Sequence, residues 1–273
     1  LCLGSGIGDF IGRRDCQQRV CRGPRKIREI RLSTFQDKLK QAELDPEYAY
    51  LKRDPRGMTA VWHKCFELFC HALFNLWCPA KVEGRENLPS APFIFCSNHC
   101  SHMDSAALMY AGGEDFDQYG MVAAKDYFFD NKSRNNFLSR LMNLIPADRG
   151  ASRESIVRLM VACREFTSHR NRSIIIYPEG TRSQSGDMST MKKGAAMIAT
   201  ELNLPIVPVY IDGTHRAYPK GVKIIRPTRV RIYIGEAIDP HRFAEEHGKG
   251  RSNYTAITTE MESRIRKMKE LHG

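Results

Sequence analysis

Short apolar runs that alternate with helical patterns dominate the chain from about residue 81 onward, and they constrain the fold more than any other feature. Each run is followed by turn residues and then by apolar residues at helical spacing, which is typical of parallel strands connected by helices. The expected strands are residues 93–97, 121–124, 173–177, 206–211 and 230–235. We therefore expect an α/β fold with a mostly parallel sheet flanked by helices.

Helix signals lie between and after these runs. Ser152 is a suitable N-cap for a helix, whose apolar face contains Ile156, Leu159, Met160, Cys163 and Phe166. Residues 190–203 and 253–271 also have helical patterns. In the second of these, pairs four residues apart are expected to reinforce the helix, Glu260 with Arg264 and Glu262 with Arg266.

An amphipathic helix is predicted over residues 58–80. Its large apolar side chains recur at three- and four-residue steps, namely Trp62, Phe66, Phe69, Leu73, Leu76 and Trp77. Such a face fits two environments, the protein core or the interface of a bilayer, where Trp and basic residues are favoured. The sequence contains no run of about 20 uncharged apolar residues, so a membrane-spanning helix is not expected.

The chain divides into three parts by composition. Residues 1–45 are rich in Gly and Arg without apolar periodicity, and we interpret them as a basic, poorly ordered arm. Residues 46–80 are expected to form an amphipathic helical element at a membrane surface. Residues 81–273 are expected to form the α/β domain that performs the chemistry.

Charge and cysteine content limit the possible binding partners of the protein and indicate the redox compartment in which it lies. The 42 Lys and Arg residues exceed the 31 Asp and Glu residues, and the formal net charge of +11 favours polyanions such as nucleic acid, an anionic bilayer or phosphorylated substrates. The sequence lacks nucleic-acid-binding signatures, so membrane or phosphate is favoured over nucleic acid. The nine cysteines are an odd number scattered through apolar segments, which indicates a reducing compartment.

Residues 98–104 (NHCSHMD) directly follow the first expected strand, and open α/β sheets place their sites at the carboxyl ends of strands. His99 and Asp104 are five positions apart across a strand-to-helix turn. The carboxylate can therefore hold one imidazole nitrogen and leave the other one basic. A positioned base accelerates the attack of a hydroxyl group on a carbonyl carbon by about 10²–10⁴-fold. The pair is the candidate catalytic base of an acyl transfer.

Two other interpretations of this segment stay open. His99, Cys100, His102 and Asp104 could bind a metal ion, although four ligands so close in sequence need a second supporting segment, and none is obvious. Cys100 could instead act as a covalent nucleophile if its surroundings stabilise a thiolate. We expect no metal ion and no bound cofactor.

A second polar segment, residues 178–183 (PEGTRS), follows the expected strand 173–177. Gly180 lets backbone amides approach an anion, and the guanidinium of Arg182 can form paired hydrogen bonds with a phosphate. Glu179 can orient this arginine or contact the glycerol of a substrate. Lys192 and Lys193 follow downstream and add positive charge. This segment is therefore a candidate phosphate clamp.

Three further segments are weaker candidates. Residues 147–150 (ADRG) place Arg149 just before the Ser152 cap, and a helix N-terminus is a natural anion site. Residues 204–210 (LPIVPVY) indicate a core strand or the wall of an acyl-chain site. Residues 125–145 mix aromatic and basic side chains, which suits either an anionic membrane surface or a buried helix with solvated charges.

The order NHCSHMD, ADRG, YPEGTRS, LPIVPVY resembles the four successive motifs of the glycerolipid acyltransferase family, typified by 1-acyl-sn-glycerol-3-phosphate acyltransferases (PlsC-like), over roughly residues 81–240. The resemblance implies that His99 is the general base and that Asp104 orients it. It also implies a substrate-binding group that grips the acceptor's phosphate, comprising Arg149, Glu179, Gly180, Thr181 and Arg182, with Asn98 and Ser101 at supporting motif positions.

The resemblance further implies an α/β fold with an N-terminal helical element at the membrane, and acyl-CoA or acyl carrier protein as acyl donor. We expect an enzyme on the cytoplasmic face of a membrane that acylates 1-acyl-sn-glycerol 3-phosphate (lysophosphatidate), forming phosphatidate in phospholipid biosynthesis. Glycerol 3-phosphate or another lysophospholipid is the alternative acceptor. Rivals of other classes are a non-catalytic membrane-binding scaffold and a thioester hydrolase that uses Cys100.

Overall fold

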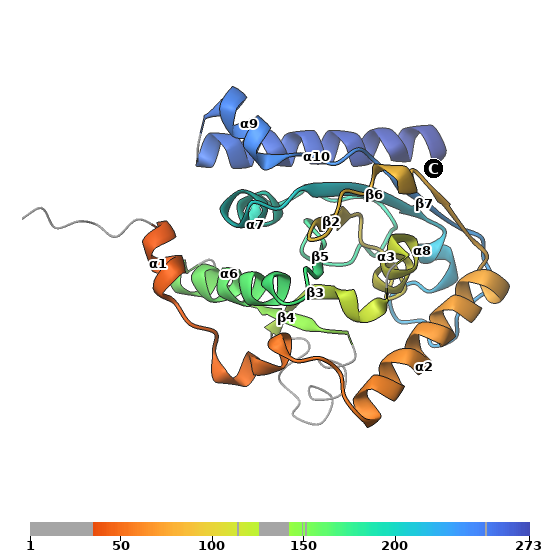
Figure 1. Ribbon diagram of the computed structural model, residues 1–273. Helices are drawn as coiled ribbons and strands as arrows, with labels where there is room; N and C mark the ends of the chain where they lie inside the picture. The colour runs from red at the N-terminus through yellow and green to blue at the C-terminus, as the bar shows by residue number, and fades with distance from the viewer. Residues whose placement is uncertain (1–34, 114, 126–141, 149, 151, 249) are drawn as a thin grey trace, which may run out of the picture. The chain divides into compact units, whose positions relative to one another are not determined.

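The computed structural model describes residues 35–113, 115–125, 142–148, 150, 152–248 and 250–273 (Figure 1), which belong to one compact unit, Thr34–Gly273. Its elements along the chain are α1 (Phe35–Gln41), η1 (Pro46–Lys52), α2 (Met58–Ala72), η2 (Leu73–Trp77), β1 (Ala80–Glu83), η3 (Arg85–Asn87), β2 (Ile94–Ser97), α3 (Asp104–Gly112), η4 (Phe116–Gln118), β3 (Tyr119–Ala124), β4 (Leu144–Ala147), α6 (Arg153–Ser168), β5 (Ser173–Ile176), α7 (Gly194–Leu202), β6 (Ile206–Asp212), α8 (Thr214–Ala217), β7 (Val230–Ile234), α9 (Pro240–His247) and α10 (Arg251–His272).

The seven strands form one mixed sheet in the order β1-β7-β6-β2-β5-β3-β4. Every neighbouring pair is parallel except β6 and β7, which are antiparallel. The mostly parallel sheet and its five expected strands are confirmed. The sequence analysis missed the two edge strands, β1 and β4. Both are only four residues long, and β4 contains Pro146, which argues against a strand except at a sheet edge.

Helices cover both faces of the sheet (Figure 1), and alternate residues of each strand point to opposite sides. On β2, Ile94 and Cys96 belong to the core formed with α6, α7 and α10, whereas Phe95 belongs to the core formed with η2 and α3. The central strands β2 and β5 are buried throughout. This explains why they read as continuous apolar runs and not as alternating ones.

The predicted helices are present. Ser152 caps α6, its Oγ accepting a hydrogen bond from Ser155 N at 3.1 Å. The ion pairs expected on α10 also form, with N–O distances of 2.6 Å for Arg264–Glu260 and 2.7 Å for Arg266–Glu262. Helix α7 begins at Gly194, four residues later than expected, because residues before it are held by the polar segment that follows β5.

The amphipathic helix predicted over residues 58–80 corresponds to α2 and η2, which together have two apolar faces. Leu73 and Phe74 are buried against the sheet. Other large side chains of the same elements are more than half exposed: Met58, Val61, Trp62, Leu68, Phe69, Leu76 and Trp77. One side of these elements therefore belongs to the core, and the other side has no covering in the described part of the chain.

The expected arm, residues 1–45, is ordered at its end. Residues 35–41 form α1, and Leu39 is buried beside α6. Arg164 of α6 donates hydrogen bonds to the carbonyl oxygens of Leu39 and Ala42. The boundary at residue 45 stays a prediction. Residues 1–34 of the expected arm lie outside the described residues.

Candidate active site

Three neighbouring strands end where the polar motifs begin. In the sheet β2 lies between β6 and β5, and all three run in the same direction, so the segments that follow them meet at one edge. Asn98 directly follows β2, and its side-chain amide pairs with the backbone of Ile211 as a neighbouring strand would. Its Nδ2 donates to Ile211 O at 2.9 Å, and its Oδ1 accepts from Ile211 N at 2.8 Å. This pairing holds the first motif beside the end of β6.

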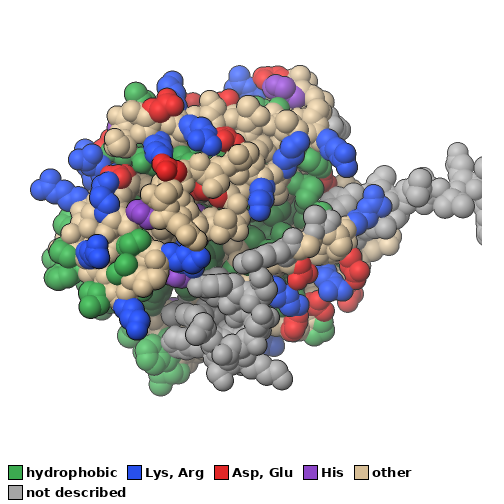
Figure 2. All heavy atoms as spheres, turned by 180° about the vertical axis from the view of Figure 1, so that it is seen from behind, with side chains coloured by type: hydrophobic (Ala, Val, Ile, Leu, Met, Phe, Trp, Pro, Cys, Tyr) green, Lys and Arg blue, Asp and Glu red, His purple; other side chains and the backbone are tan. Residues whose placement is uncertain are grey.

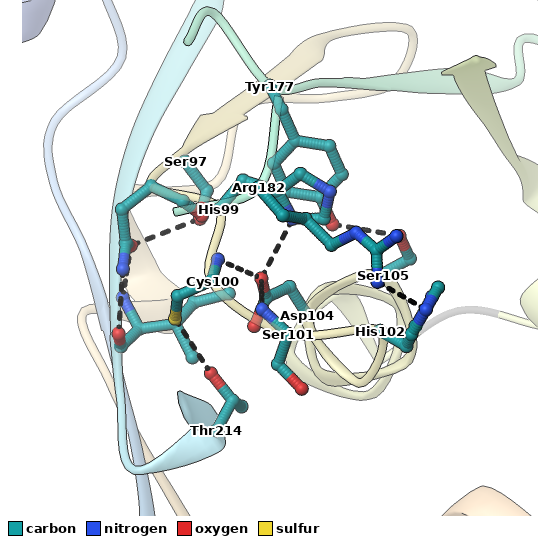
Figure 3. A network of polar contacts seen from close by, with 12 residues as sticks. Ser97, His99, Cys100, Ser101, His102, Asp104, Ser105, Tyr177, Arg182 and Thr214 are labelled. Carbon is teal, nitrogen blue, oxygen red and sulfur yellow. Dashed lines mark hydrogen bonds and ion pairs between the residues drawn. The ribbon is translucent and has the colours of Figure 1, made fainter. Parts of the chain in front are cut away.

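Asp104 forms the centre of the first motif, at the start of α3. Its carboxylate is fully buried, and Oδ2 lies 2.9 Å from His99 Nδ1. The same oxygen accepts hydrogen bonds from the backbone N–H groups of Cys100 and Ser101, each at 2.8 Å (Figure 3). Because this oxygen is a carboxylate acceptor, the shared proton belongs on His99 Nδ1, and Nε2 is left as the basic nitrogen.

The imidazole of His99 is positioned by a second contact that the sequence analysis missed. The ring of Tyr177 stacks on it, with centroids 3.7 Å apart and planes inclined by 12°. Burial raises the pKa of Tyr177, so its hydroxyl stays protonated and is held by Ser105 Oγ at 2.8 Å. The side chain of His99 is 17% exposed, which leaves the ring accessible to a substrate. The sequence signal that could have indicated this contact is an aromatic residue, Tyr177, directly after β5.

Glu179 ties the two motifs together. Its Oε1 accepts a hydrogen bond from His99 N at 2.9 Å, and its Oε2 accepts one from Ser189 N at 2.7 Å. The backbone adds a further link, since Ser183 N donates to His99 O at 2.8 Å. Glu179 as a whole is 3% exposed. We therefore assign Glu179 to positioning of the segment that follows β5.

Asn98 and Ser101 are likewise engaged within the protein. Both are buried, and Ser101 Oγ donates to Tyr218 O at 2.7 Å while accepting from Met103 N at 3.1 Å. From the sequence, these two residues and Glu179 were expected among the substrate-binding residues. Their contacts support the role of internal braces, which sequence alone does not separate from substrate contacts because both require a polar side chain at a strand exit.

Arg182 lies beside the base. Its guanidinium contacts the imidazole of His102 (Figure 3). His102 is exposed as a whole residue, but partial desolvation of its ring, followed by the charges of Arg182 and His99, lowers the pKa of His102 to about 4. The imidazole at position 102 is therefore neutral near pH 7. A neutral ring adds no second positive charge beside Arg182.

Lys192 is a cation that the sequence analysis noted without placing it. Gly180 has φ +73°, and a β-carbon built there would lie 2.9 Å from Lys192 Nζ. The ammonium group thus passes directly over the glycine, and a side chain at position 180 would displace it. Thr181, the next residue, is exposed. Lys192 therefore lies over the exposed turn 180–181, while Arg182, the residue after this turn, extends its guanidinium to His102. An ammonium group and a guanidinium are both suited to a phosphate.

Comparison with known families identifies the segment that contains this geometry. Residues 79–212, which include both motifs and the strands that position them, match the family model described as Acyltransferase. The chain therefore contains a domain of the acyltransferase family. The acyltransferase domain spans β1 to β6 of the sheet.

Relatives agree with this assignment. The 1-acyl-sn-glycerol-3-phosphate acyltransferase of Limnanthes douglasii is 31% identical over 154 residues, which is 56% of this chain and 52% of that protein. The protein of the same description from Cocos nucifera is 40% identical over 168 residues, covering 62% and 52%. The chain thus spans about half the length of these curated relatives.

A solved structure is also similar. The crystal structure of PlsC from Thermotoga maritima, described as a 1-acyl-sn-glycerophosphate (LPA) acyltransferase, matches with a TM-score of 0.57 and 27% identity, covering 82% of this chain and 85% of that one. The α/β fold of the acyltransferase domain is therefore that of PlsC.

The alternative readings of the first motif do not fit its geometry. Cys100 Sγ faces Thr214 Oγ1 at 3.5 Å, away from the His99–Asp104 pair, and His102 faces Arg182. Among the described residues, no group of three or more His, Cys, Asp or Glu side chains is placed to hold a metal ion. Burial and the charge of Asp104 raise the pKa of the Cys100 thiol to about 12. The acyltransferase domain thus lacks an activated thiolate at this position.

Cys100→Ala should leave acyl transfer within about twofold of wild type, because the neutral thiol dominates at every pH below about 12 and a thiol is a poor nucleophile. For the same reason, iodoacetamide should label Cys100 slowly at pH 8 in the folded protein, while exposed Cys65 is labelled readily. Mass spectrometry of the alkylated peptides measures both. Loss of activity in Cys100→Ala, with an unchanged melting temperature, would favour the covalent mechanism.

The remaining candidate segments have two outcomes. Arg149 and residues 126–141 lie outside the described residues, so the predictions for them stay predictions. Residues 206–210 form most of β6, which is buried from Ile206 to Ile211, so the fourth motif is a core strand.

A separate cavity of about 540 Å³ lies between η1 and α2, lined by residues such as Arg53, Arg56 and His169. It contains none of the motif residues, and we place the chemistry at the motifs.

Proposed function

We propose that this chain transfers a fatty acyl group from an acyl thioester to the free hydroxyl of 1-acyl-sn-glycerol 3-phosphate, forming phosphatidate. The observation that supports this most strongly is the 2.9 Å contact of His99 Nδ1 with buried Asp104. The acyltransferase domain and the printed names of the relatives support the same reaction class. Acyl-CoA and acyl carrier protein are the two donors proposed.

The geometry supports a direct transfer. His99 Nε2 accepts the proton of the acceptor hydroxyl as its oxygen attacks the thioester carbonyl carbon, and Asp104 stabilises the imidazolium that forms. The new C–O bond replaces the C–S bond, and the departing sulfur takes the proton from the imidazolium. The products are the ester and the free thiol of the donor. His99 returns to its neutral form without any covalent enzyme intermediate.

The acceptor's phosphate is proposed to bind at the exposed turn 180–181. Lys192 lies over Gly180 of this turn, and Arg182 directly follows the turn with its guanidinium at His102. A guanidinium with an ammonium group compensates the charge of a phosphate monoester. A phosphate held there places the neighbouring glycerol hydroxyl in reach of the first motif, because Ser183 N is bonded to His99 O. The clamp favours acceptors with a terminal phosphate over larger headgroups.

Association with a membrane surface is proposed from the exposed face of α2 and η2. In the described part of the chain, no helix combines the length and apolar character needed to traverse a bilayer. Several large apolar side chains of α2 and η2 nevertheless face solvent, including Trp62 and Trp77 at 51% and 52% exposure. A face of this kind suits the bilayer interface. We propose that it lies on the cytoplasmic face, where the described cysteines stay reduced, as all six are free.

The test is a product assay with purified full chain. A radiolabelled acyl-CoA or acyl carrier protein thioester is incubated with lysophosphatidate, glycerol 3-phosphate, lysophosphatidylcholine or no acceptor, and the lipids are separated. We expect labelled phosphatidate from lysophosphatidate. Label in another lipid would assign a different acceptor, label only in free fatty acid would indicate a hydrolase, and no product with either donor would indicate a scaffold.

Arg182→Ala should raise the KM for lysophosphatidate by about 10- to 100-fold, the effect of losing a charge-assisted hydrogen bond. Arg182→Lys keeps the charge but loses the planar fork, so an intermediate effect is expected. The KM for the acyl donor should change little. A rise in the pKa of His102 from about 4, measured by NMR, would show independently that the charge of Arg182 has been removed from this ring. An unchanged KM with a raised His102 pKa would place the phosphate elsewhere.

A further inference from the structure

The loop between α8 and β7 is strongly basic. Residues 218–229 (YPKGVKIIRPTR), here named the basic loop, contain four cationic residues and no acidic one. All four are exposed, and within the described part of the chain none of them forms an ion pair: Lys220, Lys223, Arg226 and Arg229. An uncompensated cluster of this kind costs free energy through repulsion and favours an anionic partner.

The basic loop is joined to the exposed apolar face of η2. Trp77 Nε1 donates a hydrogen bond to Ile225 O at 3.0 Å, and Cys78 Sγ contacts Arg226 O at 3.4 Å. Ile224, the neighbouring residue, is 77% exposed, and Leu76 of η2 is 80% exposed. Figure 2 shows hydrophobic and basic side chains interspersed on the flank at the left of the view, where α2 of Figure 1 lies after the rotation. The loop thus extends that apolar face and adds charge to it.

The other end of the basic loop is bonded to the catalytic motif. Tyr218 O accepts the hydrogen bond from Ser101 Oγ at 2.7 Å, and the rings of Tyr218 and His102 are 6.1 Å apart. Gly213 fixes the base of the loop with φ +90°, where a β-carbon would lie 2.2 Å from Arg229 O. The basic loop therefore connects the segment that contains the catalytic base, His99, with the end of η2.

We propose that the basic loop is a second membrane-contact segment, which binds the headgroups of anionic phospholipids through its cations and inserts Ile224 into the bilayer interface. Two observations select this partner: cations without counter-ions, which match an anionic surface, and a large apolar side chain among them, which a nucleic acid would not need. The inference extends the proposed function, because contact at this loop brings the first motif to the edge of the bilayer that contains the lipid acceptor.

The test is co-sedimentation of the full chain with phosphatidylcholine vesicles, with and without phosphatidylserine. Wild type should bind the anionic vesicles more tightly, and added salt should weaken the difference. Lys220→Glu/Lys223→Glu should lower the partition coefficient for anionic vesicles by at least about 25-fold, about fivefold for each lysine. The matched control is Arg251→Glu/Lys267→Glu, which changes the charge equally. Both residues belong to α10, which packs on the core at the other face of the sheet. Equal binding of the two double variants would overturn the proposal.

Insertion of Ile224 is measured separately. Ile224→Trp should show a blue shift and stronger tryptophan emission on addition of anionic vesicles, relative to wild type. Leu271→Trp, at a position that is 65% exposed on α10, should show neither. Absence of a spectral change at position 224 would overturn insertion. Because vesicle binding needs no turnover, an inactive chain that still binds through the basic loop would overturn the proposed function alone, and an active chain whose loop variants bind normally would overturn this inference alone.

Discussion

Replacing His99 with alanine should lower the rate of acyl transfer by about 10²–10⁴-fold, the contribution of a positioned general base. The fold should survive, because Asp104 keeps its hydrogen bonds from Cys100 N and Ser101 N and the His99 backbone keeps its partners Glu179 and Ser183. Initial rates with labelled acyl-CoA and lysophosphatidate measure the effect, and thermal melting checks the fold.

The matched control is His169→Ala. This histidine also pairs with a carboxylate, Asp54 at 3.0 Å, but it lies after α6, outside the motifs. Its loss should leave the rate near that of wild type. A His99→Ala protein with more than about a tenth of wild-type activity would contradict the assignment of the base.

Asp104→Asn should also lower the rate by about 10²–10⁴-fold, although the amide is close in shape to the carboxylate. The amide has no charge to stabilise an imidazolium, and its NH₂ group can force His99 into the opposite tautomer. Asp104→Ala should in addition destabilise the protein, by about 1–3 kcal/mol for each buried backbone N–H that loses its acceptor. Activity assays and denaturant titrations separate the two effects.

Asp212→Asn serves as the control for both variants. This aspartate ends β6 and pairs with Arg216 at 2.8 Å, so its loss tests the effect of removing a carboxylate near the same sheet edge. Activity should stay within about twofold of wild type, because Asp212 lies outside the polar motifs and its partner Arg216 is exposed. If Asp104→Asn kept full activity, Asp104 would be a structural residue only.

Much of this site is predictable from local patterns. The strand exits at Ser97 and Ile176 are visible as buried apolar runs followed by polar residues, and parallel topology then requires that the exits of neighbouring strands meet at one edge. The pairing of His99 with Asp104 follows from their spacing across a strand-to-helix turn. These features depend on short-range chain geometry, which sequence expresses directly.

Other features depend on contacts between distant segments, which leave no local pattern. The stacking of Tyr177 on His99 and the hydrogen bond from His99 N to Glu179 join residues about 80 positions apart. For the same reason, the sequence did not distinguish the bracing roles of Asn98 and Ser101 from substrate contacts. The division of α2 and η2 into buried and exposed apolar faces also required the sheet, since both faces have helical periodicity.

The central claim is that the imidazole of His99 is held in the tautomer that leaves Nε2 basic. Long-range ¹H–¹⁵N NMR correlation of ¹⁵N-histidine-labelled protein, with His99→Gln to assign the signals, reports this tautomer directly. In the neutral imidazole of His99, we expect a protonated Nδ1 and an unprotonated Nε2. A proton on Nε2, with Nδ1 unprotonated beside Asp104, would contradict it.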